Sequence, residues 1–111
     1  MEIKTRKEKG ILVLDVSGRM DSLTSPDFDR CFASLADQGE DRFLVNLGGL
    51  VYISSAGLRS ILGSAKRMKA KGGRFMLAGL HGAVKETFEL AGLYTSFEVY
   101  DSTEAALCKI T

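Results

Sequence analysis

The chain has 111 residues, with 15 Lys and Arg against 14 Asp and Glu and a formal net charge of +1. This length is typical of one domain, and the balanced charge gives no electrostatic reason to expect nucleic acid or a membrane surface as the partner. Hydrophobic residues make up 45% of the chain, which is enough for a packed core. The sequence has no apolar run of roughly 18 residues and no signal-peptide pattern, so we expect a cytoplasmic protein without membrane insertion.

The N-terminal part of the sequence predicts a β-hairpin followed by a helix. The segments EIKTRKEKG and ILVLDVSGRMD form the two strands, and Lys9-Gly10 makes the turn. In the segment TSPDFDRCFASLADQG, Ser25 is expected as the N-cap and Pro26 as the first helical residue. The apolar stripe of this helix consists of Phe28, Cys31, Phe32 and Leu35, and Gly39 ends it.

The rest of the chain alternates strands and helices. The segment RFLVNL is short and nearly all apolar, which is typical of a central strand, and GGLVYISS is expected as the loop that follows it. An amphipathic helix comes next, followed by strand RFMLAGL, helix GAVKETFELAGL, strand SFEVY and helix DSTEAALCKI. The residues that we expect to be buried are Leu44, Val45, Leu58, Ile61, Leu62, Phe75, Leu77, Val84 and Phe88.

This order of elements predicts an α/β fold. Strands that alternate with helices form crossover connections, and these give a parallel sheet. The N-terminal hairpin adds one antiparallel pair at an edge. We therefore expect a mixed, mostly parallel sheet of four or five strands with about four helices, the main ones packed chiefly on one face.

The sequence lacks the usual signatures of catalysis. It contains no GxGxxG, GxxxxGK[ST], HExxH or GxSxG motif. The single histidine, His81, lies in a predicted loop without a Cys or His nearby in the sequence. Cys31 and Cys108 fit no metal-binding spacing and are expected as two buried thiols. We therefore expect a protein that is not an enzyme and that has no metal site and no cofactor.

Two adjacent serines stand at the start of the central helix, in the segment YISSAGLRSIL. Either Ser54 or Ser55 can cap the helix, but a cap needs only one hydroxyl. A cap does not explain Gly57, because glycine in a helix is less stable than alanine by about 1 kcal/mol. This cost suggests that another group comes close to the backbone at Gly57. The serines also follow a central strand, where the helix dipole and free amides favour an anion. A bare cap and a hydroxyl that carries a phosphate both fit these residues.

The sequence resembles the STAS domain of anti-sigma factor antagonists. The resemblance runs from about Leu12 to the C-terminus, so one STAS domain over residues 1–111 is expected. It is carried by FLVNL, GGLVYISSAGL, RSILGSAKRMKAKGG, RFMLAGL and VKETFELAGLYTSFEVYDSTEAAL. Its most specific part is the Ser-Ser-x-Gly-Leu segment together with the LAGL helix end. Asn46 stands at a strand position where the family often has Asp or Asn.

The resemblance implies a regulatory protein that is not an enzyme. Such proteins bind an anti-sigma factor that is also a serine kinase, phosphorylation of a serine at the helix start ends the binding, and a PP2C-type phosphatase restores it. Aligning the family motif Asp-Ser-Ser-Gly on Gly57 makes Ser55 the phosphate acceptor, with Ser54 in the aspartate position and as the alternative acceptor. The resemblance places partner binding at Ser54, Ser55, Ala56, Gly57, Arg59 and Ser60, where Ala56 and Gly57 are expected to keep an exposed surface low for the partner.

Two other functions stay open at this point. The first is a STAS interaction module for a different partner, such as a stressosome-like, two-component or lipid-transport complex, without phospho-switching. The second is a small nucleotide- or anion-binding domain that uses the helix start. The absence of a phosphate-binding glycine loop argues against this second function.

Overall fold

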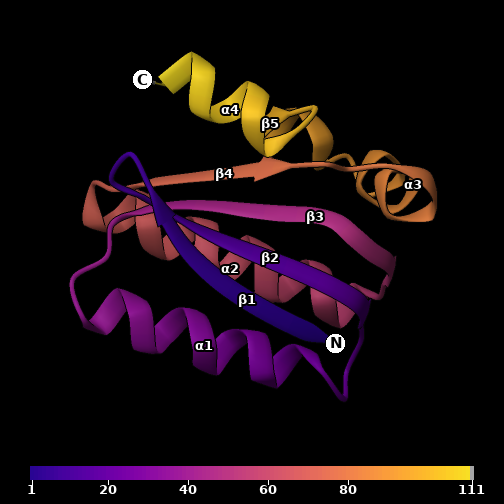
Figure 1. The fold of residues 1–111 in the computed structure, drawn as a ribbon. Coiled ribbons are helices and arrows are strands. Elements are labelled where there is room, and N and C mark those ends of the chain that lie inside the picture. Colours follow the sequence, from indigo (N-terminus) through magenta and orange to yellow (C-terminus); the bar gives the residue numbers. More distant parts are fainter. Residues whose placement is uncertain (111) are drawn as a thin grey trace.

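A five-stranded sheet with helices on both faces forms the fold in the computed structural model, which describes residues 1–110 (Figure 1). The strand order is β1-β2-β3-β4-β5, with β1 and β2 antiparallel and the other pairs parallel. The expected fold class is therefore confirmed. The elements are β1 (Glu2–Glu8), β2 (Ile11–Met20), α1 (Ser25–Asp37), β3 (Arg42–Ile53), α2 (Ser55–Lys71), β4 (Arg74–Ala78), α3 (Gly82–Leu90), a 3-10 turn (Tyr94–Ser96), β5 (Glu98–Tyr100) and α4 (Thr103–Ile110).

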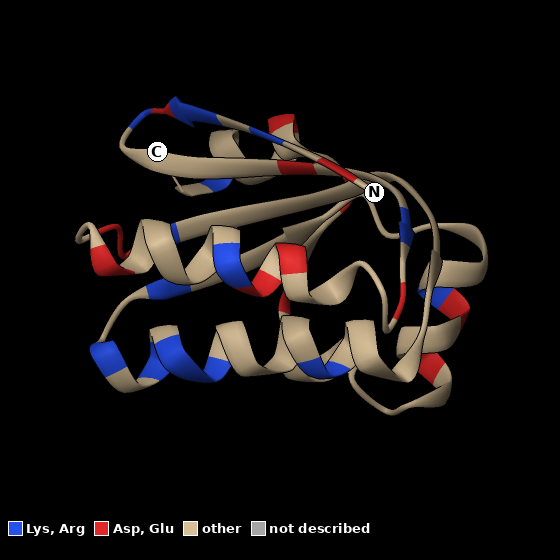
Figure 2. Ribbon diagram, turned by 90° about the horizontal axis from the view of Figure 1, so that it is seen from below, with Lys and Arg blue, Asp and Glu red and all other residues tan. Residues whose placement is uncertain are grey.

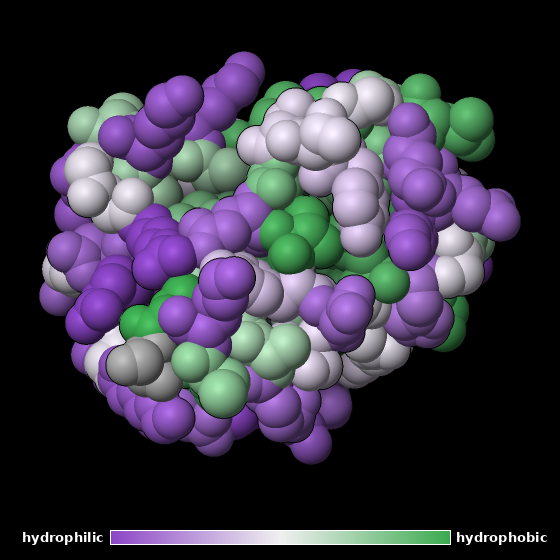
Figure 3. Space-filling view, turned by 90° about the horizontal axis from the view of Figure 1, so that it is seen from above, coloured by the Kyte–Doolittle hydropathy of each residue, from purple (hydrophilic) through white to green (hydrophobic). Residues whose placement is uncertain are grey.

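The helices divide unequally between the two faces of the sheet. Helices α1, α2 and α3 pack on one face and bury the larger apolar cluster, which includes Phe28, Ile61 and Phe88. Helix α4 lies on the other face, where Ala106 and Leu107 cover a smaller cluster (Figure 1). Seen from the α4 side, hydrophilic side chains surround a smaller area of hydrophobic atoms (Figure 3). The main helices therefore do share one face, as expected.

Most of the expected core is buried. The residues that lie fully inside are Leu44, Val45, Ile61, Leu77, Val84 and Phe88. Leu58, Leu62 and Phe75 are only partly buried. Leu62 and Phe75 instead line an open groove between α2 and the segment 96–98. The expectation of two buried thiols is wrong for Cys108, which α4 exposes, and Cys31 is half-buried.

Strand β3 is longer than the sequence predicts. The segment GGLVY was expected as a loop but continues β3 to Ile53, because β2 also continues to Met20 and pairs with it in parallel. Two register shifts in β2 allow this pairing. Gly49 lies opposite Ser17, and a Cβ atom at Gly49 would lie 2.8 Å from the Ser17 Cβ. Gly49 therefore serves close strand approach instead of a turn.

Helix α1 also starts differently from the expectation. Ser25 is already helical, and the N-cap residue is Thr24, whose side chain makes no capping hydrogen bond. The Asp21 carboxylate accepts hydrogen bonds from the amides of Leu23 and Thr24, at 3.0 and 3.1 Å. The Asp21 carboxylate thus provides an acceptor for the backbone amides just before the helix. The Ser25 hydroxyl is therefore not used as a cap.

Helix α2 starts in close contact with the end of β2. The Ser54 amide donates a hydrogen bond to the Met20 carbonyl at 2.9 Å. Gly57 is buried against the same strand end, and a Cβ there would lie 2.7 Å from Ile53 Cγ1 and 3.0 Å from the Met20 carbonyl oxygen. The expectation that Gly57 keeps an exposed surface low for a partner is therefore wrong. Glycine is needed so that the first turn of α2 can approach the sheet.

We predict that Ile61→Ala lowers the free energy of unfolding by about 2–5 kcal/mol, as a truncation inside the core. Leu62→Ala removes a side chain of similar size, but its loss should be smaller because Leu62 already faces an open groove. Urea unfolding of both variants measures the difference. Equal losses would show that Leu62 is as well packed as Ile61.

We predict that Gly57→Val lowers the free energy of unfolding by at least about 1–3 kcal/mol, since the new side chain overlaps Ile53 and the Met20 backbone. Ala70→Val is the matched control, because Ala70 is exposed in the same helix. It should lose only a few tenths of a kcal/mol from β-branching. Similar losses in the two variants, measured by urea unfolding, would contradict the close-contact explanation for Gly57.

Candidate functional site

The two serines at the start of α2 have different roles. Ser54 is the N-cap, with φ −92° and ψ 175°, and its Oγ accepts a hydrogen bond from the Gly57 amide at 3.2 Å. Its carbonyl accepts the first bond of the helix from the Leu58 amide, at 2.9 Å. Ser54 is half-buried. Its hydroxyl is therefore used to hold the helix start, which is the ordinary role of serine at this position.

The hydroxyl of Ser55 is free for chemistry. Ser55 is the first residue of α2 and is exposed, and within residues 1–110 its side chain makes no hydrogen bond. The amides of the first helical turn, among them those of Ser55 and Ala56, have no acceptor within the helix. The positive pole of the helix dipole lies at the same point. An anionic group on Ser55 would therefore sit in a favourable local field.

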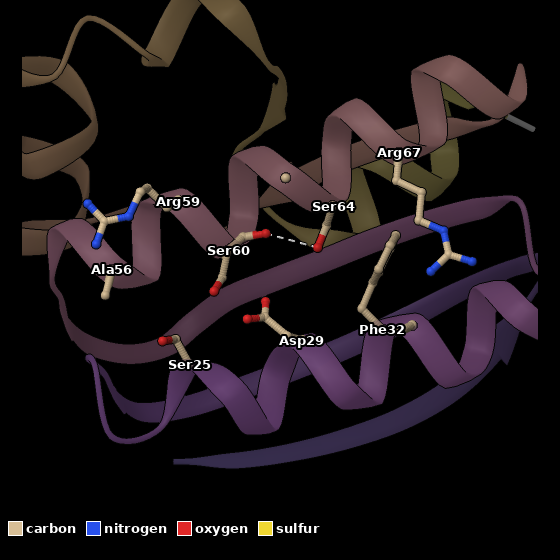
Figure 4. Close-up of a pocket in the computed structure, with 10 residues that line it drawn as sticks. Ser25, Asp29, Phe32, Ala56, Arg59, Ser60, Ser64 and Arg67 are labelled. Atoms are coloured by element: carbon tan, nitrogen blue, oxygen red, sulfur yellow. Dashed lines mark hydrogen bonds between the residues drawn. The ribbon is translucent and has the colours of Figure 1, made fainter.

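An open groove runs from this helix start along α2, with α1 as its other wall. Ala56, Arg59 and Ser60 come from α2, and Ser25 and Asp29 face them from α1 (Figure 4). The two helices lie side by side when seen from below (Figure 2). The groove, called the α1–α2 groove below, encloses about 490 Å³. Its lining consists of Ser25, Asp29, Phe32, Ala33, Ala56, Arg59, Ser60, Gly63, Ser64 and Arg67.

The structure brings most of the residues singled out by the sequence into one surface. Ser54 and Ser55 stand at its end, and Ala56, Arg59 and Ser60 line the groove. Gly57 is the exception, because it points toward the sheet. The sequence analysis missed the α1 wall, namely Ser25 and Asp29. Their spacing of four residues on one helix face was the available signal.

Two aspartates, Asp15 within β2 and Asp21 just after it, are held in their charged form. The amides of Thr24 and Leu23 lower the pKa of Asp21, in the turn before α1. Burial alone would raise the pKa of Asp15, but hydrogen bonds from Arg6 and Asn46 outweigh it, and the net shift is downward. Both carboxylates are occupied by local structure. Neither is poised as an acid or a base.

Asn46 and His81 make polar contacts around Gly48, within β3. The Asn46 Nδ2 donates to Asp15 Oδ1 at 2.8 Å, and its Oδ1 accepts from the Gly48 amide at 3.0 Å. The His81 Nε2 lies 2.9 Å from the Gly48 carbonyl oxygen. Within residues 1–110 no group of three or more His, Cys, Asp or Glu side chains is placed to hold a metal ion. No helix in that part of the chain is long and apolar enough to cross a membrane.

Comparison with known proteins identifies the fold and the family. The sequence model of the STAS domain matches residues 2–106. BtrV of Bordetella bronchiseptica, a candidate anti-sigma factor antagonist, is 37% identical over 106 residues, which cover 96% of this chain and 91% of the relative. A candidate anti-sigma factor antagonist from Thermotoga maritima has the same fold, with a TM-score of 0.90 at 18% identity over 96% of this chain and 92% of that one.

A further solved structure is the Bacillus cell fate determinant SpoIIAA in its phosphorylated form. It matches 99% of this chain and all of its own, with a TM-score of 0.77 at 18% identity. At these identities the solved structures show the fold, whereas the family assignment rests on the STAS match and on the relative from Bordetella. Because the STAS match spans nearly the whole chain and this relative is close, the chain belongs to the STAS domain family and, within it, to the anti-sigma factor antagonists.

Proposed function

We propose that this protein binds an anti-sigma factor that is also a serine kinase, and that phosphorylation of Ser55 ends the binding. A PP2C-type phosphatase then restores the binding form. One observation carries the choice of residue: Ser54 uses its hydroxyl to cap α2, while the hydroxyl of Ser55 is exposed and free of hydrogen bonds within the described residues. A kinase can reach Ser55 without opening the helix.

The comparisons support this proposal at the level of the family. The relative from Bordetella is named as a candidate anti-sigma factor antagonist, and SpoIIAA is known in a phosphorylated form. A protein that regulates by binding also does not need an acidic, a basic and a nucleophilic side chain placed together. We infer that the protein acts without cofactor or catalysis, in the cytoplasm where sigma factors work.

The replacement of the family aspartate by Ser54 fits the same function. Serine and aspartate are about equally good N-caps, so Ser54 keeps the start of α2 in place. The substitution removes a negative charge next to the proposed acceptor. A phosphate on Ser55 therefore meets no neighbouring carboxylate at position 54, and the local field favours the phosphorylated form more strongly.

A phosphate on Ser55 would affect binding much more than folding. It adds a charge of about −1.5 to −2 at neutral pH. At an exposed helix N-terminus the dipole stabilises negative charge by roughly 0.3–1 kcal/mol. Inside an interface, a buried charge without a partner costs several kcal/mol. Since about 1.4 kcal/mol corresponds to a tenfold change in affinity, a loss of about 3 kcal/mol weakens binding more than a hundredfold.

We predict that Ser55→Asp weakens binding to the anti-sigma factor kinase at least tenfold, with an unchanged circular dichroism spectrum. Aspartate carries only part of the charge of a phosphate, so its effect should be smaller than that of phosphorylation. Calorimetric titration with the purified kinase gives the affinity. Ser55→Asn is the matched control of similar shape without charge, and it should bind like the wild type.

We predict that the kinase with ATP places a single phosphate on Ser55, as detected by mass spectrometry of the intact protein and its peptides. Ser55→Ala should bind the kinase but gain no phosphate. Ser54→Asp should keep both binding and phosphorylation, because aspartate preserves the cap. Ser54→Ala should also be phosphorylated but should lose about 0.5–2 kcal/mol of stability with the cap.

Three outcomes would contradict the proposal in different ways. Phosphate on Ser54 alone would move the switch by one residue. Binding of the kinase without phosphate on either serine would leave a STAS module that is not phospho-switched. Tight binding of ATP or GTP to the isolated protein, without kinase binding, would instead favour a nucleotide-binding domain.

A further inference from the structure

A second groove lies between the C-terminal half of α2 and the start of β5, away from the two serines. It encloses about 390 Å³, and small-molecule sites usually enclose roughly 300–1,000 Å³. Lys69, on its rim, stands roughly 21 Å from Ser55 along the helix axis, at about 1.5 Å per residue. The groove is called the α2–β5 groove below, and the residues that matter for its chemistry are Leu62, Ala65, Lys66, Lys69, Phe75, Phe97 and Glu98.

Three large apolar side chains are left open to the α2–β5 groove. Leu62, Phe75 and Phe97 pack against the larger core cluster, yet each of them is only partly buried. The ring of Phe97 is held in place by two other rings, with centroids 6.4 Å away at Phe75 and 5.8 Å away at Phe88. The groove is therefore a formed apolar surface, and apolar surface with a polar rim is typical of a binding site.

The rim of the groove carries positive charge. Lys66 and Lys69 are exposed, and neither has an ion pair within the described residues. Lys and Arg residues gather toward this end of α2 (Figure 2). The negative pole of the helix dipole accounts for Lys69, which lies in the last turn, but Lys66 precedes that turn. The two ammonium groups are thus available to an anion that enters the groove.

Glu98 is the one acidic side chain on the groove within residues 1–110, and its charge is already neutralised. The Arg74 Nε donates a hydrogen bond to Glu98 Oε1 at 3.1 Å, and Arg74 also pairs with Oε2. The bonds from Arg74 lower the pKa of Glu98, so this pair stays ionised. Glu98 therefore does not offset Lys66 and Lys69, and the groove is complementary to a negative group.

The size of the groove favours a small ligand over a protein partner. The stretch of α2 from Leu62 to Lys69 spans roughly 10 Å. A typical protein interface needs about 800 Å² from each partner, which is more than a groove of this length offers. Carbon–carbon bonds are about 1.5 Å long, so an extended zigzag of about eight carbons spans roughly 9 Å. A short alkyl chain with an anionic end fits this length.

We propose that the α2–β5 groove binds a medium-chain fatty acid. The carboxylate lies between the ammonium groups of Lys66 and Lys69, and the alkyl chain lies against Leu62, Phe75 and Phe97. Charge-assisted hydrogen bonds fix the anionic end, and burial of the chain supplies the apolar contribution. This binding needs neither the anti-sigma factor nor a phosphate on Ser55, so it goes beyond the proposed function and does not rest on it.

The first test is a titration of the purified protein with octanoate, followed by the amide shifts in ¹H–¹⁵N NMR spectra. Octanoate should bind saturably, with a Kd below about 1 mM, and the largest shifts should fall within residues 62–75 and 96–98. Octan-1-ol is the matched ligand, with the same chain and no charge. It should bind at least about tenfold more weakly, because it cannot form the ion pairs.

The second test removes the two cations. The double variant Lys66→Gln with Lys69→Gln should bind octanoate at least about tenfold more weakly than the wild type and should bind octan-1-ol as the wild type does. Lys4→Gln with Lys109→Gln is the matched control, because both lysines are exposed and neither lines the groove. This control loses the same net charge, so it should change the Kd less than about twofold.

The third test fills the groove. Ala65 lines it and is half-buried, so Ala65→Leu should place a larger side chain where the alkyl chain lies and should weaken octanoate binding at least about tenfold. Ala70→Leu is the matched control in the same helix, exposed and outside the groove, and it should bind like the wild type. Circular dichroism establishes that each variant is folded, and the lysine variants decide the matter if Ala65→Leu is not.

Several results would overturn this inference and leave the proposed function untouched, since the kinase takes no part in these experiments. They are the absence of saturable octanoate binding, equal affinity for octanoate and octan-1-ol, and shifts centred outside the α2–β5 groove. Sedimentation equilibrium adds a further one. A dimer that octanoate does not dissociate and that Ala65→Leu abolishes would show that a second copy of the chain fills the groove.

Discussion

The contact between the first turn of α2 and the end of β2 determines the geometry of the site. The Ser54 amide bonds the Met20 carbonyl, and the Gly57 backbone lies against the same carbonyl with no room for a Cβ atom. This contact fixes where β3 ends and where α2 begins. It also fixes the rotation of the helix, and rotation decides which serine faces the sheet and which faces solvent. The division of roles between Ser54 and Ser55 follows from a backbone contact that only glycine permits.

The same rotation aligns the other side of α2 with α1. Once Gly57 faces the sheet, Ala56, Ser60 and Gly63 face the neighbouring helix, and the α1–α2 groove begins one residue after Ser55. A modification at the helix start is thereby adjacent to the groove without any need for a conformational change. An anion at this position is compatible with the helix dipole, so the domain has no reason to unfold when it is added. The proposed phosphorylation of Ser55 would therefore change a binding surface while the fold stays the same.

Local pattern in the sequence was sufficient for the order of strands and helices, the hairpin at Lys9-Gly10 and the mixed, mostly parallel character of the sheet, because each depends on short-range periodicity and turn residues. The order of the strands within the sheet was not predicted. It was not sufficient where tertiary contacts decide. The GGLVY segment carries turn residues, yet the bulged β2 strand recruits it into β3. Gly57 was correctly recognised as a site of close approach, but a sequence cannot tell whether the approaching group belongs to the same chain or to a partner. Ser25 and Asp29 join the site only through the packing of α1 beside α2.

The two glycines of α2, Gly57 and Gly63, differ in whether the surrounding fold requires them. Glycine at position 57 lowers the helix propensity of α2. This loss is offset inside the domain, because a residue without a side chain lets the helix pack directly against Ile53 and the end of β2. At Gly63, the same loss of propensity has no compensating contact within the described residues. Such a residue can persist because natural proteins are rarely at their stability optimum. The Gly57 contact, in contrast, is one that the fold needs, and a phosphate on Ser55, as proposed, would be added at the exposed helix start and would leave that contact and the rest of the fold intact.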